Sequence, residues 1–219
     1  CIDEVLEKGE TIFRNPHSGK DLILSASLMQ WHGKNSILLR ISEHADRYFD
    51  PLTGLPNMEY SRLCGEDFAE DIRKKGGSPS IVFFDIVGMK LYNSANGFDM
   101  GNEFLINFAA CLKKNFPDNL IWRFSNDHFA VIVDIQNIEE KLNEIRRCVK
   151  SSISKISMDL YVGISKIDEF DAILDASEKA KLACHEQKKN GDTFIRYYDD
   201  DLRKDLLLQN YIVNHIDDL

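Results

Sequence analysis

The sequence predicts an α/β domain, an α+β sandwich in which helices cover a mixed β-sheet. Two observations indicate this class. Apolar strand-like segments alternate with amphipathic helical segments along most of the chain, and two of the strands are separated by only a few residues, as in a hairpin. A chain of 219 residues, 43% hydrophobic and 29% charged, is long enough and apolar enough to bury such a core.

The first 45 residues differ in pattern from the remainder. Strand-like segments at 10–14, 21–30 and 36–41 alternate with turns and predict a small antiparallel β meander, preceded by a short helix at 2–8. Such a meander is marginal alone, because its apolar face needs a partner. By pattern and order it resembles the closing strands of a PAS sensor domain. We therefore expect residues 1–45 to be a partial PAS-like β meander.

The rest of the chain alternates regularly between the two kinds of element. The spacing of apolar residues predicts four helices and five strands in one domain. The helices are expected at 58–75, 102–114, 138–149 and 169–188, and the strands at 80–86, 120–124, 130–133, 158–164 and 193–197. Residues 199–219 form a charged linker that leads into an amphipathic helix.

One segment before the first of these helices is specific enough to indicate a family. Asp50-Pro51-Leu52-Thr53-Gly54-Leu55-Pro56-Asn57 is stiff and rich in turn residues, and Asn57 is a suitable N-cap. It matches the D-x-L-T-G-L-P-N entry of the GGDEF family, the diguanylate cyclases, and the resemblance covers about residues 46–198. The resemblance implies a nucleotidyl cyclase-like fold. It also implies a reaction that joins two GTP molecules, one per subunit of a dimer, through 3′-hydroxyl attack on an α-phosphate.

Two carboxylates are the candidate metal ligands. The apolar strand at 80–86 carries Asp85 near its end, and a buried carboxylate needs a partner. The resemblance implies that Asp85 is the first metal-binding Asp and that the Ile86 carbonyl also reaches the metal. Asp127, in the hairpin, would add a second carboxylate for Mg²⁺, which prefers oxygen ligands in octahedral geometry. Alternatively, Asp85 is a turn or capping residue.

The hairpin departs from the family at its catalytic turn. Ser125-Asn126-Asp127-His128-Phe129 stands where the family has G-G-D-E-F. The paired glycines admit substrate to a bare backbone and tolerate positive φ, which Asn accepts better than Ser. His128 replaces a Glu beside the cations; it is mostly neutral at pH 7 and would repel them if protonated. Phosphoryl transfer depends on positioned charges, so we expect the cyclase reaction to be lost or vestigial.

The candidate nucleotide contacts are partly altered. The resemblance assigns the triphosphate to the turn at Gly88 and to Lys90, although a solvated surface Lys is an alternative. Asn93 stands where the family binds the guanine edge. Asn102 replaces the Asp that assists it and presents a donor where a carboxylate accepts, which should weaken guanine binding and blur base selectivity. Alternatively, Asn102 serves only as a helix N-cap.

The two phosphate and product motifs of the family are also changed. The late A-K-x-x-G-R-N motif aligns with 184–190, so His185 stands at its Lys and Lys189 at its Arg. A His is a weaker phosphate partner than Lys, whereas Lys189 can partly replace Arg. The R-x-x-D of the inhibitory product site is replaced at Phe116 and Asn119, so feedback inhibition there should be absent.

Three functions follow as alternatives. The first is a degenerate signalling domain that responds weakly to GTP or a related nucleotide, with Mg²⁺ if nucleotide is bound. The second is an active diguanylate cyclase that makes c-di-GMP, and the third is a dimerisation or spacer domain without a ligand. The ends of the chain imply flanking PAS and EAL domains in a longer protein, although the segment 199–219 could equally be a terminal helix packed on its own domain.

The net charge, the lengths of the apolar runs and the cysteines indicate which partners and which compartment to expect. The net charge of −9 argues against nucleic acid and against contact with an anionic membrane. No apolar run approaches the ~18 residues of a membrane span, and the five scattered cysteines fit reduced thiols in the cytoplasm. The chain does not begin with Met, so it could be cut from a longer protein that is tethered to a membrane. If the domain is an active cyclase, a homodimer is the expected assembly.

Overall fold

The computed structural model describes residues 10–14, 21–31, 34–42, 47–136, 138–151, 158–169, 171–190 and 193–214. Contacts divide the chain into two compact units, Cys1–Pro51 and Leu52–Leu219. The helix predicted at 2–8 lies outside the described residues.

The first unit contains one three-stranded antiparallel sheet. Strands β1 (Glu10–Arg14), β2 (Asp21–Trp31) and β3 (Lys34–Ser42) pair in the order β1-β2-β3. The predicted antiparallel meander is therefore confirmed, and its relation to a PAS domain stays a prediction.

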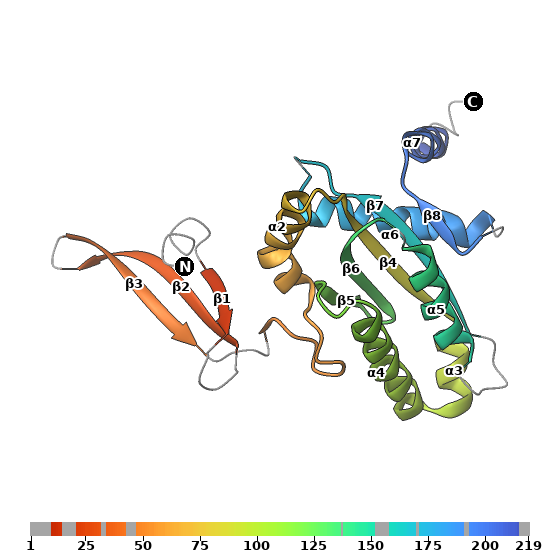
Figure 1. The fold of residues 1–219 in the computed structure, drawn as a ribbon, viewed down its shortest axis with the longest axis horizontal. Helices are drawn as coiled ribbons and strands as arrows, with labels where there is room; N and C mark the ends of the chain where they lie inside the picture. The colour runs from red at the N-terminus through yellow and green to blue at the C-terminus, as the bar shows by residue number, and fades with distance from the viewer. Residues whose placement is uncertain are drawn as a thin grey trace. The chain divides into compact units, whose positions relative to one another are not determined.

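The second unit is built on a mixed five-stranded sheet in the order β5-β6-β4-β7-β8 (Figure 1). Every neighbouring pair is antiparallel except β7 and β8, which are parallel, so the predicted mixed sheet is confirmed. Its strands are β4 (Pro79–Val87), β5 (Ile121–Ser125), β6 (His128–Asp134), β7 (Asp159–Lys166) and β8 (Ile195–Tyr197).

Six helices of this unit are described: α2 (Met58–Lys74), α3 (Met89–Asn96), α4 (Phe98–Asn115), α5 (Glu139–Lys150), α6 (Ile173–Asn190) and α7 (Asp200–Asn214). Asn57 caps α2 as predicted, because its side chain accepts a hydrogen bond from the Tyr60 N–H at 3.2 Å. Helix α4 begins at Phe98 after its cap residue Gly97, so the alternative role of Asn102 as an N-cap is wrong. Helix α3 lies where the sequence indicated only a turn.

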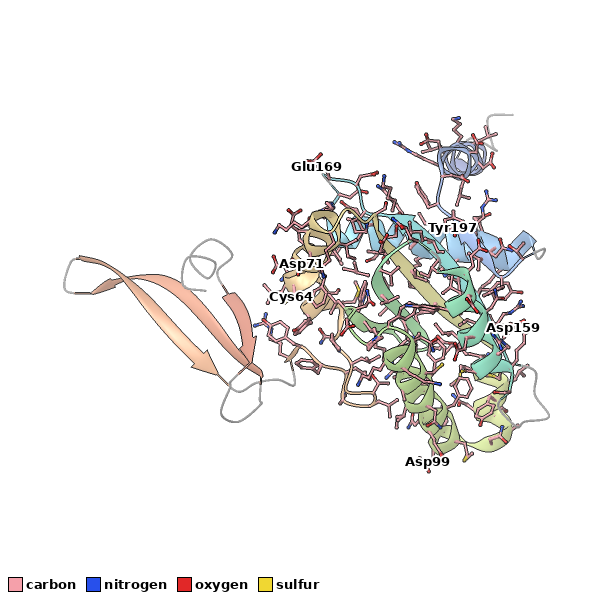
Figure 2. All side chains as sticks on the ribbon, viewed as in Figure 1. Cys64, Asp71, Asp99, Asp159, Glu169 and Tyr197 are labelled. Atoms are coloured by element: carbon pink, nitrogen blue, oxygen red, sulfur yellow. The ribbon has the colours of Figure 1, made fainter. Side chains whose placement is uncertain are left out.

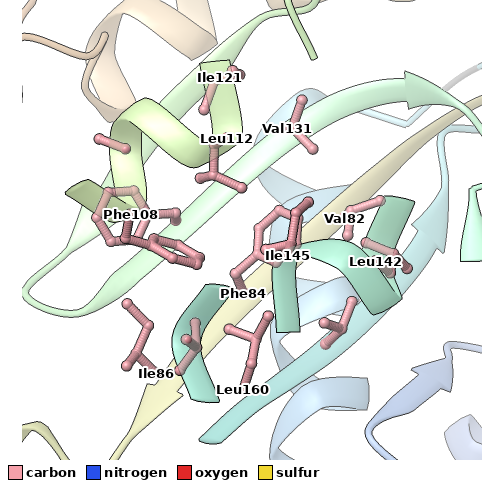
Figure 3. Packing of buried hydrophobic residues seen from close by; sticks show 14 of the residues in the cluster. Val82, Phe84, Ile86, Phe108, Leu112, Ile121, Val131, Leu142, Ile145 and Leu160 are labelled. Atoms are coloured by element: carbon pink, nitrogen blue, oxygen red, sulfur yellow. The ribbon is translucent and has the colours of Figure 1, made fainter. Parts of the chain in front are cut away.

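The helices cover the sheet on two faces and bury two separate apolar clusters. Helices α4 and α5 pack on one face against Val82, Phe84 and Ile86 of β4 (Figure 3). Helices α2 and α6 pack on the other face, against Ile81 and Phe83. Successive strand residues point to opposite faces, so Asp85 follows Ile81 and Phe83 to the side covered by α6. This alternation decides which groups can meet the Asp85 carboxylate.

Helix α6 lies unusually close to the sheet at one glycine of β7. A Cβ atom on Gly163 would lie 2.5 Å from the amide nitrogen of Cys184 and 2.8 Å from its Cβ, and closer still to the Ala180 carbonyl oxygen. These are main-chain neighbours that no side-chain rotation can move. Gly163 therefore fixes the distance between α6 and the sheet.

Among the described residues, we find no helix with the length and apolar content that a membrane span requires.

Replacing Gly163 with Ala should destabilise the unit by about 3 kcal/mol, because the added methyl group forces α6 off the sheet. Urea unfolding followed by circular dichroism measures this change. The control is Lys166→Ala at the exposed end of the same strand, which should stay within about 0.5 kcal/mol of the parent. Equal stability of the Gly163→Ala variant and the parent would contradict the close approach.

A bidentate ion pair joins α5 to β7. Arg146 donates from Nε to Oδ1 of Asp159 at 2.8 Å and from Nη2 to Oδ2 at 2.9 Å, and Lys150 Nζ lies 3.2 Å from Oδ2 (Asp159 is labelled in Figure 2). Burial opposes ionisation of Asp159. The hydrogen bonds from Arg146, the Leu160 N–H and Lys150 outweigh it and lower the pKa of Asp159 to about 2.

This ion pair predicts acid sensitivity. The folded pKa of Asp159 lies below its unfolded value of about 3.9, so its contribution is complete above that value and is lost as the pH falls to about 2. We expect a loss of about 1 kcal/mol over this window, after allowance for solvent screening of a partly exposed pair. Unfolding titrations across the window measure it. Asp159→Asn should flatten that part of the pH profile, and an unchanged profile in the variant would contradict the assignment.

Candidate functional site

A cavity of about 680 Å³ opens between α3, the start of α4 and the β5–β6 hairpin. Its walls combine cationic, amide and apolar side chains with one carboxylate. The lining residues are Met89, Lys90, Asn93, Ser94, Phe98, Leu105, Arg123, Asn126 and Asp127. The structure thus brings together the predicted site residues Lys90, Asn93 and Asp127, and places Asn102 outside this lining, exposed on α4.

Helix α3 presents Lys90 and Asn93 to this cavity because of two glycines. Gly88 caps the helix in the left-handed region at φ 102°, a conformation that favours glycine. Gly101 of α4 makes room for the Asn93 amide: a Cβ atom there would lie 2.9 Å from Asn93 Cγ. The Oδ1 atom of Asn93 faces Gly101 and is buried without a hydrogen-bond partner among the described residues.

The hairpin turn is tighter than the sequence suggested. Ser125 pairs with His128, so only Asn126 and Asp127 form the turn. Asn126 has φ 41° and is the one non-glycine residue with positive φ among those described, which agrees with the expectation that Asn suits this position. Arg123 holds the turn by donating from Nε to the Asn126 carbonyl at 2.9 Å.

The backbone ties this turn to the family-like entry segment and to β4. The Arg123 N–H donates to the Pro56 carbonyl at 2.9 Å, and the Ile86 N–H donates to the Asp127 carbonyl at 3.4 Å. The second bond places the turn directly beside the end of β4. It brings Asp127 close to Asp85, near the end of β4.

His128 lies between these two carboxylates. Its Nε2 atom is 3.3 Å from Oδ2 of Asp85 and 3.7 Å from Oδ1 of Asp127, while its Nδ1 atom is 3.1 Å from the Ser125 hydroxyl. The His128 ring thus lies within ion-pair distance of both carboxylates and within hydrogen-bond distance of the Ser125 hydroxyl. The carboxylates of Asp85 and Asp127 therefore both lie near Nε2 of His128.

Lys188 of α6 makes the second contact of Asp85. Its ammonium forms an ion pair with Oδ2 of Asp85, whose side chain is only 2% exposed. Burial opposes ionisation of Asp85, but the hydrogen bonds and charges of His128 and Lys188 outweigh it and lower the pKa of Asp85. Asp85 is thus held as a carboxylate between two nitrogen groups.

Lys188 was not among the predicted site residues, because the family motif gave the phosphate role to its neighbour Lys189. The spacing of apolar residues along α6 could have identified Lys188. Ala176, Ala180 and Cys184 are buried at intervals of four along α6, and Lys188 is the next residue of that stripe. A basic residue that continues a buried stripe toward a strand carrying an Asp indicates an ion pair. The side chain of Lys189 lies outside the described side chains.

The remaining predicted phosphate residue, His185, lies on the same helix as Lys188. Burial lowers the pKa of His185, an effect that the charge of Asp85 only partly offsets. A more weakly basic imidazole is a poorer partner for phosphate than the Lys of the family motif.

The oxygen donors alone do not fit the Mg²⁺ that the resemblance implies. Asp85, Asp127 and the Ile86 carbonyl are the candidate oxygens, but His128 and Lys188 both face Oδ2 of Asp85. Mg²⁺ requires oxygen ligands in octahedral geometry and is repelled by an ammonium. In the described part of the chain, no three His, Cys, Asp or Glu side chains are grouped as a metal site requires.

Comparison with known proteins agrees with this architecture. The family described as diguanylate cyclase, GGDEF domain, matches residues 47–193. The probable diguanylate cyclase DgcI of Escherichia coli is 28% identical over 137 residues, which are 60% of this chain and 30% of DgcI. The chain therefore spans less than a third of the length of this relative.

Two solved structures share the fold. The GGDEF domain of TpbB (YfiN) from Pseudomonas aeruginosa superposes with a TM-score of 0.62 at 20% identity, covering 73% of this chain and 99% of that one. The GGDEF domain of DgcB from Caulobacter crescentus, solved with c-di-GMP, gives 0.58 at 18% identity, with coverage of 71% and 98%. With the entry segment, the mixed sheet and the β5–β6 hairpin all in place, the chain belongs to the GGDEF family of diguanylate cyclase domains.

Proposed function

We propose that this domain is a degenerate member of its family, which binds GTP or a related purine nucleotide weakly and acts as a regulatory module in c-di-GMP signalling. The observation that carries the proposal is the contrast between two neighbouring regions. The cavity beside α3 keeps groups suited to a nucleotide, whereas the carboxylate pair at the hairpin is occupied by protein nitrogens.

The cavity supports binding of a base and of phosphate. Asn93 offers a buried amide to a purine edge, and Phe98, 77% exposed at the rim, offers a ring on which a base can stack. Lys90 and Arg123 supply positive charge for phosphate oxygens. Asn102 lies outside the lining, so discrimination between guanine and other purines rests mainly on Asn93.

The hairpin supports impaired catalysis. The family's transfer reaction depends on charges positioned around the phosphate, and His128 supplies no carboxylate to that arrangement. Ser125 and Asn126 also add side-chain atoms where the family has two glycines. Phe116, expected to replace a charged residue of the inhibitory product site, is buried in the core, and Asn119 donates to the Ile132 carbonyl at 2.9 Å. Neither is available to bind product.

The surrounding organisation is part of the proposal. We take residues 1–45 as the end of a PAS-like input domain, 46–198 as the GGDEF domain and 199–219 as the lead into an EAL domain. In this arrangement the domain lies in the cytoplasm, pairs with a second copy and passes its nucleotide state to its neighbours. DgcB, solved with c-di-GMP, illustrates the kind of ligand that this family handles.

Calorimetric titration with GTP in Mg²⁺ buffer, followed by a chromatographic assay for c-di-GMP, tests the proposal. We expect weak binding and no product. Formation of c-di-GMP would instead establish an active cyclase, and the absence of binding at millimolar-range GTP would establish a spacer. Either result overturns the proposed function.

A substitution at Gly101 tests whether Asn93 binds the base. Ala is a better helix former than Gly by about 1 kcal/mol, yet its methyl group would displace the Asn93 amide. We expect Gly101→Ala to weaken GTP binding at least about tenfold while the protein stays folded. Ile106→Ala, which places the same residue at an exposed position of α4, is the matched control. Unchanged binding in Gly101→Ala would remove Asn93 from the site.

A further inference from the structure

The Asp85 carboxylate is the most buried charge at the hairpin edge of the sheet, and its environment differs from that of Asp127. The Asp85 side chain is 2% exposed, and the Asp127 side chain 31%. Asp127 can be hydrated, whereas Asp85 must be matched by a cation within the protein or by a bound ion. The identity of that cation decides whether the fold depends on metal.

Lys188 supplies the charge in this protein. Its ammonium contacts Oδ2 of Asp85, the same atom that lies 3.3 Å from Nε2 of His128. An ion bound at Oδ2 would have to share this small volume with an ammonium group. Because like charges repel strongly where water is excluded, the two cations are alternatives.

The main chain places Lys188 at this point. Helix α6 is held against β7 at Gly163, where a Cβ atom would lie 2.5 Å from the Cys184 nitrogen. Lys188 follows Cys184 by one turn on the same face, so its stem is directed to the end of β4. The Lys188 side chain is 34% exposed, which leaves it able to turn into solvent if Asp85 loses its charge.

We propose that the Lys188 ammonium takes the place of a divalent cation at Asp85, so that the domain keeps its fold and its nucleotide cavity without metal. The cavity is lined by Lys90, Arg123 and the single carboxylate of Asp127, but not by Asp85. Two cations against one carboxylate give phosphate a cationic contact that needs no bridging ion. The proposal rests on the proposed function only for its statement about nucleotide.

Metal binding to the nucleotide-free protein is the first test. Free Mn²⁺, followed by electron paramagnetic resonance, reports binding directly, and thermal unfolding with EDTA or MgCl₂ reports the effect on stability. We expect the parent protein to bind Mn²⁺ weakly and to unfold at the same temperature in both buffers. Lys188→Ala should bind Mn²⁺ at least about tenfold more tightly and become more stable with metal than without it.

Two further variants control for loss of the side chain itself. Lys188→Arg keeps a cation at this position and should behave as the parent protein. Lys181→Ala removes an ammonium two turns earlier on α6, where it pairs with Glu178, and should also match the parent. Tight Mn²⁺ binding or metal-dependent stability in the parent protein would overturn the proposal, even if Lys188→Ala did not fold.

Nucleotide binding gives the second test. The Kd of the parent protein for GTP should agree within about threefold between EDTA and MgCl₂ buffers. Loss of a metal-mediated contact would instead change the Kd by about tenfold or more. Binding only with MgCl₂ would overturn the proposal. If GTP binds in neither buffer while the Mn²⁺ results hold, the proposed function fails and the role of Lys188 stands.

Discussion

A carboxylate shielded from water at the end of a central strand requires an opposite charge, and Asp85 imposes that requirement on this domain. The strand pairing sets His128 directly opposite Asp85, and the packing of α6 delivers Lys188 to the same oxygen. Removing either partner would leave a charge whose burial is costly. The local structure of the hairpin, the end of β4 and the late part of α6 are therefore linked through one side chain.

The arrangement separates two tasks that an active site would combine. The cavity beside α3 is lined by cationic and amide side chains, while the Asp85 carboxylate faces His128 and Lys188. Asp127 is the residue common to both regions, since it lines the cavity and approaches His128 at 3.7 Å. Asp127 therefore joins the cavity wall to the hairpin residue that faces Asp85.

Much of this organisation was available from sequence. Alternation of strands and helices gave the mixed sheet, the D-x-L-T-G-L-P-N segment indicated the family, and Asn57 was identified as a cap. Helix α3 was missed because it has only eight residues and directly follows Gly88, which by itself indicates a turn. Lys188 was missed because the family motif gave the phosphate role to Lys189, although the buried stripe of Ala176, Ala180 and Cys184 leads to Lys188. How closely α6 lies on the sheet follows from a single glycine in a distant strand, and local periodicity does not reveal that distance.

The contact at Gly163 has a consequence for how this protein can change over evolutionary time. A helix whose peptide groups rest on the sheet depends little on the side chains of its solvent-facing side. Random replacement along the solvent side of α6 should accumulate without shifting the charged group near its end, whereas the lone glycine beneath the helix tolerates almost no change.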